Sequence, residues 1–181
     1  MSEVEVSLRI AFYLLNHDIA ASDVEVAIDG AQVKTGDTVH FSIAEFIAQN
    51  ACVPVSTAPS WQTTYSREGA NFQIKVHSNP GRGDVVALLR SGHTLRVESK
   101  KGPLTRSRSS AEYPLLREAI GQLMTVRDVG DADILAVAVP KSPKFAELTA
   151  RWRDAPLIRR LGIRLLTVDR ENGVEGLEPI A

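Results

Sequence analysis

The chain lacks several features that would assign it to a class at once. Its 181 residues include a single cysteine, Cys52, which excludes an internal disulfide and suits a reducing compartment. No run of about 18 apolar residues occurs, so no membrane-spanning helix is expected. The first residues are acidic and lack the basic-then-apolar order of a signal peptide, which favours a cytoplasmic location.

Motifs of the common nucleotide and hydrolase sites are also missing. The chain has no phosphate loop, no dinucleotide fingerprint and no serine nucleophile elbow. Its four histidines are scattered without the spacing of metal ligands. An apolar fraction of 44% and a charged fraction of 24% are typical of a globular domain, and the length suits one domain with a small appendage.

Charge is distributed unevenly along the chain. Residues 1–70 contain three Lys or Arg against nine Asp or Glu, whereas residues 71–127 contain ten against four. Charges in the remainder nearly cancel. The basic middle segment could attract a polyanion although the whole chain is slightly acidic. A solvated surface would have the same composition, so charge alone does not separate the two interpretations.

The first third of the chain predicts two helices and a hairpin. Capping-box spacings predict helices over residues 2–16 and 42–50. Between them, Asp29-Gly30 follows an alternating run and predicts a hairpin turn. An irregular stretch follows the second helix and marks a boundary. We therefore expect an N-terminal helix–hairpin–helix extension over residues 1–66, serving as a dimer or partner surface, and a core over residues 67–181.

The core is predicted to be mixed α/β. From Phe72 onward the patterns give a strand, two further strands that form a hairpin, a helix, a strand, a helix and a final strand. An apolar stripe predicts the first of these helices over residues 111–127. The continuous apolar run at residues 134–139 predicts a buried central strand.

The stretch from Gly83 to Lys101 carries the chemistry. Asp84 begins one apolar strand, and the next strand ends in Glu98-Ser99-Lys100. Alternation along a strand places Glu98 and Lys100 on one face. Asp84 joins them only if the hairpin loop has an odd number of residues or a bulge shifts the register. We predict such a shift.

This stretch resembles the PD-(D/E)xK nuclease superfamily, which has the restriction-endonuclease-like fold. Asp84 matches the acid on the second core strand, and Glu98 and Lys100 match the (D/E)xK motif on the third. The match covers roughly residues 70–140. Gly83 stands where the motif name has proline, and the optional acid on the preceding helix has no secure counterpart. The resemblance implies a mixed sheet flanked by helices, with the N-terminal segment as an extension.

The resemblance also implies a reaction. Asp84, Glu98 and the carbonyl of Ser99 would ligate Mg²⁺, for which Mn²⁺ could substitute. Lys100 would orient or deprotonate the attacking water, and desolvation beside a metal would lower its pKa. The implied activity is hydrolysis of phosphodiester bonds in DNA, of the restriction or repair type, by a homodimer.

Other residues are secondary candidates. Gln122, on the helix after the motif strand, matches a glutamine found in some branches of the superfamily, with a plain solvent-facing side chain as the alternative. Lys101, Arg106 and Arg108 lie in the loop that leaves the site and suit phosphate contacts, or are ordinary surface charges. Two other classes remain open: a non-catalytic nucleic-acid-binding module, and an interaction subunit of a defence or repair complex. The sequence does not distinguish DNA from RNA or an endonuclease from an exonuclease.

Overall fold

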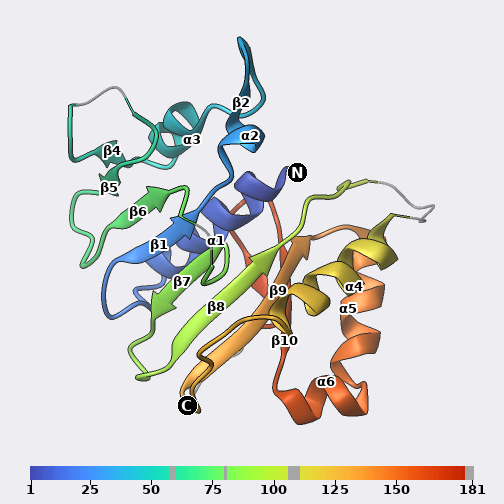
Figure 1. Cartoon of the computed structure of the whole chain (residues 1–181). Helices are drawn as coiled ribbons and strands as arrows, with labels where there is room; N and C mark the ends of the chain where they lie inside the picture. Colours follow the sequence, from blue (N-terminus) through green and yellow to red (C-terminus); the bar gives the residue numbers. More distant parts are fainter. Residues whose placement is uncertain (58–59, 80, 106–110, 178–181) are drawn as a thin grey trace.

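The computed structural model describes residues 1–57, 60–79, 81–105 and 111–177 (Figure 1). The fold is mixed α/β, as predicted, with one large mixed sheet and helices on both of its faces. Its helices are α1 (Glu3–Asn16), α2 (Gly30–Val33), α3 (Ile43–Gln49), α4 (Glu112–Leu123), α5 (Pro143–Arg153) and α6 (Pro156–Leu161). Its strands are β1 (Val24–Ala27), β2 (Lys34–Thr35), β3 (Thr38–Val39), β4 (Val53–Pro54), β5 (Thr64–Ser66), β6 (Ile74–His77), β7 (Val85–Leu88), β8 (Thr94–Ser99), β9 (Asp133–Pro140), β10 (Arg164–Val168) and β11 (Val174–Glu175).

The large sheet has the order β11-β10-β9-β8-β7-β1-β6-β5-β4, and β2 pairs with β3 separately. Strands β8, β9 and β10 are parallel, and the connections between them run through α4 and through α5 with α6. Strand β7 is antiparallel to both of its neighbours, β8 and β1. The apolar run of β9 therefore lies in the interior of the sheet, which confirms the predicted buried central strand.

Both faces of the sheet are buried by apolar packing. Along β9, Ala136 and Ala138 belong to the cluster under α1, whereas Val137 and Val139 belong to the cluster under α4 and α5. This division follows from the two-residue alternation of a strand. Figure 1 shows α1 on the face opposite α4 and α5. The helix predicted over residues 2–16 is confirmed, and its Ser2 side chain accepts a hydrogen bond from the Glu5 N–H as predicted for a cap.

The hairpin predicted at Asp29-Gly30 is wrong. The Asp29 carboxylate accepts a hydrogen bond from the Ala31 N–H at 2.9 Å, and the chain begins α2 at Gly30. An aspartate before glycine can serve as a helix N-cap as readily as a turn residue. Strand β1 consequently has no hairpin partner and pairs with β6 and β7, which come much later in the chain.

The N-terminal segment contributes directly to the sheet. Residues 1–66 supply α1, which packs over the centre of the sheet, and β1, which lies between β6 and β7. The strand predicted from Phe72 is β6, and it is separated from β7 by β1. The turn between β6 and β7 carries the chain across the end of β1. There Ala27 donates to the Asp84 carbonyl and Ile28 donates to the His77 carbonyl, both at 2.8 Å.

Among the described residues, no helix is both long enough and apolar enough to cross a membrane.

Candidate active site

The β7–β8 hairpin has the register that the sequence required. Val85 lies opposite Val97, and continuing the same pairing by one residue places Asp84 opposite Glu98. The loop is odd-numbered: Leu89 pairs with His93 through a 2.8 Å hydrogen bond, which leaves three residues between them. Gly92 takes the positive φ of 84° that such a loop needs. The predicted shift is therefore confirmed, and Asp84 shares a face with Glu98 because directly paired residues point to the same side.

The glycine before Asp84 is required by geometry. Gly83 has a φ of 113°, in a region that side chains rarely adopt, and a Cβ built there would lie 3.1 Å from the Val97 carbonyl oxygen. Proline fixes φ near −65° and could not take this conformation. The departure from the motif name at this position is thus explained by the close approach of the two strands.

One pocket of about 210 Å³ brings the candidate residues together. Asp84 directly precedes β7, Glu98 lies near the end of β8, Lys100 directly follows β8, and Gln122 lies on α4. The N-terminus of α1 closes another side with Glu3. The structure therefore places all four predicted catalytic side chains around a single cavity.

Lys100 is buried and paired. Its side chain is 5% exposed, its Nζ donates to Glu98 Oε1 at 3.0 Å, and Glu118 Oε1 lies 3.6 Å away. Burial by itself would lower the pKa of Lys100, but the hydrogen bond to Glu98 and the surrounding carboxylates raise it above its ordinary value. The lowering was expected beside a bound metal; without a metal, the carboxylates of Glu98, Glu3 and Glu118 outweigh the effect of burial. Lys100 is an ammonium ion at neutral pH.

The pKa values of the two acids of the pocket, Asp84 and Glu98, are both raised above their ordinary values. Burial, followed by repulsion from Glu98, raises the pKa of Asp84 from 3.8 to about 7. The Ser99 N–H donates to Asp84 Oδ2 at 2.7 Å and partly opposes this shift. Burial also raises the pKa of Glu98, against the hydrogen bond from Lys100. Two desolvated carboxyl groups that face one cavity are a favourable arrangement for a cation.

Glu3 is a residue of the pocket that the sequence analysis missed. It lies in the first turn of α1, accepts a hydrogen bond from Gln32 Nε2 at 2.9 Å, and raises the pKa values of both Asp84 and Glu98. The sequence signal was present, because the predicted helix over residues 2–16 contains this acid. That helix was expected to belong to a separate N-terminal extension, so Glu3 was not matched to the optional acid on the helix before the core.

The remaining candidates differ in their placement. Ser99 is fully buried, and its hydroxyl accepts a hydrogen bond from Ser7 Oγ at 2.9 Å, which ties β8 to α1. Gln122 is exposed and contributes to the pocket lining. Lys101 is exposed on the segment that leaves the pocket, and Arg106 and Arg108 lie outside the described residues.

The donor set suits a small hard cation bound in part by water. Within the described part of the chain, no group of three or more His, Cys, Asp or Glu side chains is arranged to hold a metal ion. Mg²⁺, however, is commonly held by one or two carboxylates with several waters completing its octahedron. Asp84 and Glu98 supply two such carboxylates at one pocket, and burial raises the pKa of each. These residues fit Mg²⁺.

Comparison of the chain with protein-family models, with curated proteins and with solved structures found no match.

Proposed function

We propose that this protein is a Mg²⁺-dependent nuclease of the PD-(D/E)xK superfamily that hydrolyses phosphodiester bonds in DNA. The observation that carries the proposal is the hairpin register, which sets Asp84 opposite Glu98 and leaves Lys100 at the same pocket. The sequence made this placement conditional on an odd-numbered loop, and three residues separate the Leu89–His93 pair. A surface hairpin with solvated charges would not need the half-buried acids and the buried lysine found here.

The order of elements around the pocket supports the restriction-endonuclease-like fold. Helix α1 is followed by β1, β7 and β8, which are adjacent and antiparallel, and then by α4 and by β9, which is parallel to β8. This is a helix, three strands, a helix and a strand, the order that the resemblance implies. The segment between β1 and β7 adds β6, β5 and β4 to one edge.

The pocket residues divide the chemistry between them. Asp84 and Glu98 would hold Mg²⁺, with Glu3 as a third acid beside them, and the bound ion would activate water and offset phosphate charge. Lys100, protonated and held by Glu98, can donate a hydrogen bond to a phosphate oxygen or to the attacking water. Without a bound cation the pKa of Lys100 is raised, which favours the donor role in that state. Gln122 lines the exposed side of the pocket and would donate to the same water or phosphate.

The test is a cleavage assay with matched variants. Purified protein is incubated with supercoiled plasmid, linear duplex and single-stranded DNA, in Mg²⁺, in Mn²⁺ and in EDTA. We expect metal-dependent cleavage that falls at least a hundredfold in Asp84→Asn, Glu98→Gln and Lys100→Gln, as is usual for loss of a group that stabilises the transition state. Glu68→Gln removes an exposed carboxylate outside the pocket and should retain full activity.

The outcomes separate the classes of function. A homodimer would supply the two sites needed to cut both strands together, and light scattering of the protein with DNA measures its oligomeric state directly. Metal-independent binding of DNA with no cleavage of any substrate would instead establish a non-catalytic binding module. Activity that is equal in Asp84→Asn and in the unmodified protein would refute the assignment of this pocket.

A further inference from the structure

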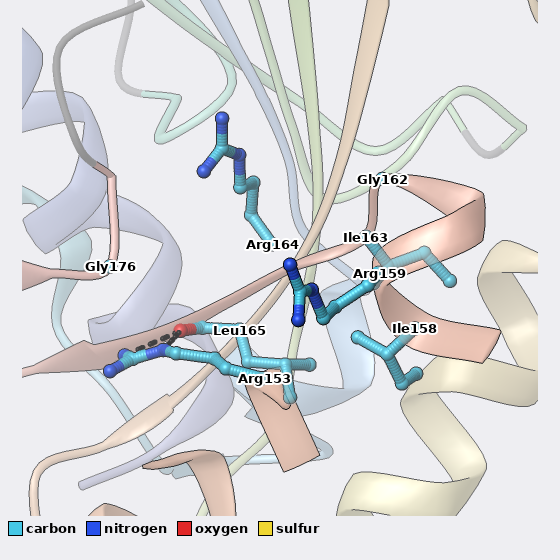
Figure 2. Close-up of a pocket in the computed structure, with 8 residues that line it drawn as sticks. All are labelled: Arg153, Ile158, Arg159, Gly162, Ile163, Arg164, Leu165 and Gly176. Atoms are coloured by element: carbon cyan, nitrogen blue, oxygen red, sulfur yellow. Dashed lines mark hydrogen bonds between the residues drawn. The ribbon is translucent and has the colours of Figure 1, made fainter. Parts of the chain in front are cut away.

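A second pocket, of about 400 Å³, lies where α6 leads into β10 (Figure 2). Three arginines from three different elements line it: Arg153 at the end of α5, Arg159 on α6 and Arg164 at the start of β10. Glycines and aliphatic side chains supply the rest of the lining, and no carboxylate is part of it. In Figure 1, α6 lies at the end of the molecule away from the N-terminus of α1, so this pocket is separate from the candidate active site.

The charged residues around this pocket are almost all arginines. Residues 151–164 contain five arginines, no lysine and one acid, Asp154. Neither Arg159 nor Arg164 makes an ion pair or a side-chain hydrogen bond with a described residue. The carboxylate of Glu175, whose pKa Arg153 helps to lower, is already engaged by Lys141 and Thr167. Arg159 and Arg164 therefore lack a counterion among the described residues, whereas Arg153 interacts with Glu175 at longer range.

One of the three guanidinium groups is held in place by the backbone. Arg153 donates to the Leu165 carbonyl oxygen from Nε at 3.0 Å and from Nη2 at 2.7 Å. Figure 2 shows these two bonds across the pocket wall. Gly176 permits the arrangement, because a Cβ built there would lie 2.6 Å from Arg153 Nη2 and 2.5 Å from the Leu165 oxygen. Arg153 is thus oriented before any ligand arrives, and its Nη1 group has no hydrogen-bond partner among the described residues.

We propose that this pocket binds a phosphate monoester, as found on a nucleotide or at the 5′ end of a nucleic-acid strand. The planar fork of a guanidinium matches two phosphate oxygens at once, which the point charge of a lysine does not. Arg153 and Arg159 supply positive charge to this cavity, whereas Figure 2 shows the Arg164 side chain extending away from both of them. The volume falls in the range of small-ligand pockets. The proposal concerns binding alone and does not depend on the proposed nuclease activity.

The test uses pairs of probes that differ only in the phosphate. Calorimetry in EDTA and low salt compares adenosine 5′-monophosphate with adenosine, and a 5′-phosphorylated oligothymidylate with its 5′-hydroxyl form. We expect the phosphorylated member of at least one pair to bind and its partner to bind at least tenfold more weakly. The change Arg159→Gln should weaken that binding tenfold or more, because the Arg159 guanidinium has no ion pair or hydrogen bond with a described residue and can bind the phosphate.

Arg160→Gln provides the matched control. Arg160 adjoins Arg159 on α6 and is exposed but does not line the pocket, so its loss removes equal charge from the same helix. We expect its affinity to change less than twofold. Binding of the mononucleotide alone would identify a nucleotide as the ligand, and binding of the oligonucleotide alone would identify a strand end. Equal binding of both members of each pair, no binding at all, or equal weakening in Arg160→Gln would overturn the proposal.

Discussion

The raised pKa of Asp84 predicts a specific dependence of stability on pH. A group whose pKa is higher in the folded protein than in the unfolded chain stabilises the fold fully below the unfolded pKa, and this contribution is lost as the pH rises through the folded pKa. For Asp84 the window extends from 3.8 to about 7. Its contribution to the free energy of unfolding should therefore decrease across this window and level off above it.

The magnitude follows from the size of the shift. A rise from 3.8 to about 7, at about 1.4 kcal/mol per pH unit, corresponds to at most about 4 kcal/mol. Partial solvent access and screening reduce this figure. Asp84→Asn cannot ionise, yet its amide oxygen can still accept the hydrogen bond from the Ser99 N–H. The variant should equal the unmodified protein near pH 4 and exceed its stability by about 2–4 kcal/mol near pH 8.

Urea unfolding in EDTA at several pH values measures this difference. Addition of Mg²⁺ gives a second measurement, because a cation bound to the carboxylate form offsets the penalty of ionisation. At ten times its dissociation constant, Mg²⁺ should stabilise the unmodified protein by about 1.4 kcal/mol near pH 8 and should stabilise Asp84→Asn less. A stability difference that stays constant from about pH 4 to about pH 8 would refute the reasoning, because it would show that Asp84 is solvated as an ordinary surface carboxylate.

Two further predictions concern the hairpin and the lysine. Gly83→Ala should destabilise the protein by about 1–3 kcal/mol, because Gly83 has a positive φ and lies close to the Val97 backbone. Gly121→Ala, at an open position of α4, should stabilise the protein by about 0.5–1 kcal/mol. Thermal unfolding compares the two variants, and similar melting temperatures would contradict this prediction. Lys100→Gln should lower the free energy of unfolding by about 2–4 kcal/mol at pH 7, because it leaves Glu98 half-buried without its partner. The neighbouring Lys101→Gln, at an exposed position, should change it by less than about 0.5 kcal/mol, and equal effects in urea unfolding would be inconsistent with a buried pair.

The candidate site could be predicted from sequence to the extent that it is local. Glu98 and Lys100 are two residues apart on a strand, so their common face follows from backbone geometry alone. Whether Asp84 lies on the same face as Glu98 and Lys100 depends on the length of the loop between β7 and β8. The sequence contains a loop around residues 91–94 but does not show which residues pair across it. The hydrogen bond between Leu89 and His93 in the structure fixes the register.

Sites formed between distant segments could not be predicted. Glu3 reaches the pocket because α1 packs over the sheet, a contact between the beginning of the chain and its middle. The arginines of the second pocket do lie close together in the sequence, since residues 151–164 contain five arginines and one acid. Only the tertiary structure shows that the end of α5, α6 and the start of β10 meet around one cavity.

The sequence by itself determined the elements whose signals lie within a few residues of one another: the cap of α1, the apolar run of β9 and the Glu-x-Lys alternation at the end of β8. The tertiary structure alone decided that β1 lies between β6 and β7 and that α1 completes the pocket. Local signals arise from dihedral preferences and periodicity, which each segment carries with it. Strand neighbours are chosen by the burial of whole faces, and that choice depends on every other segment of the chain at once.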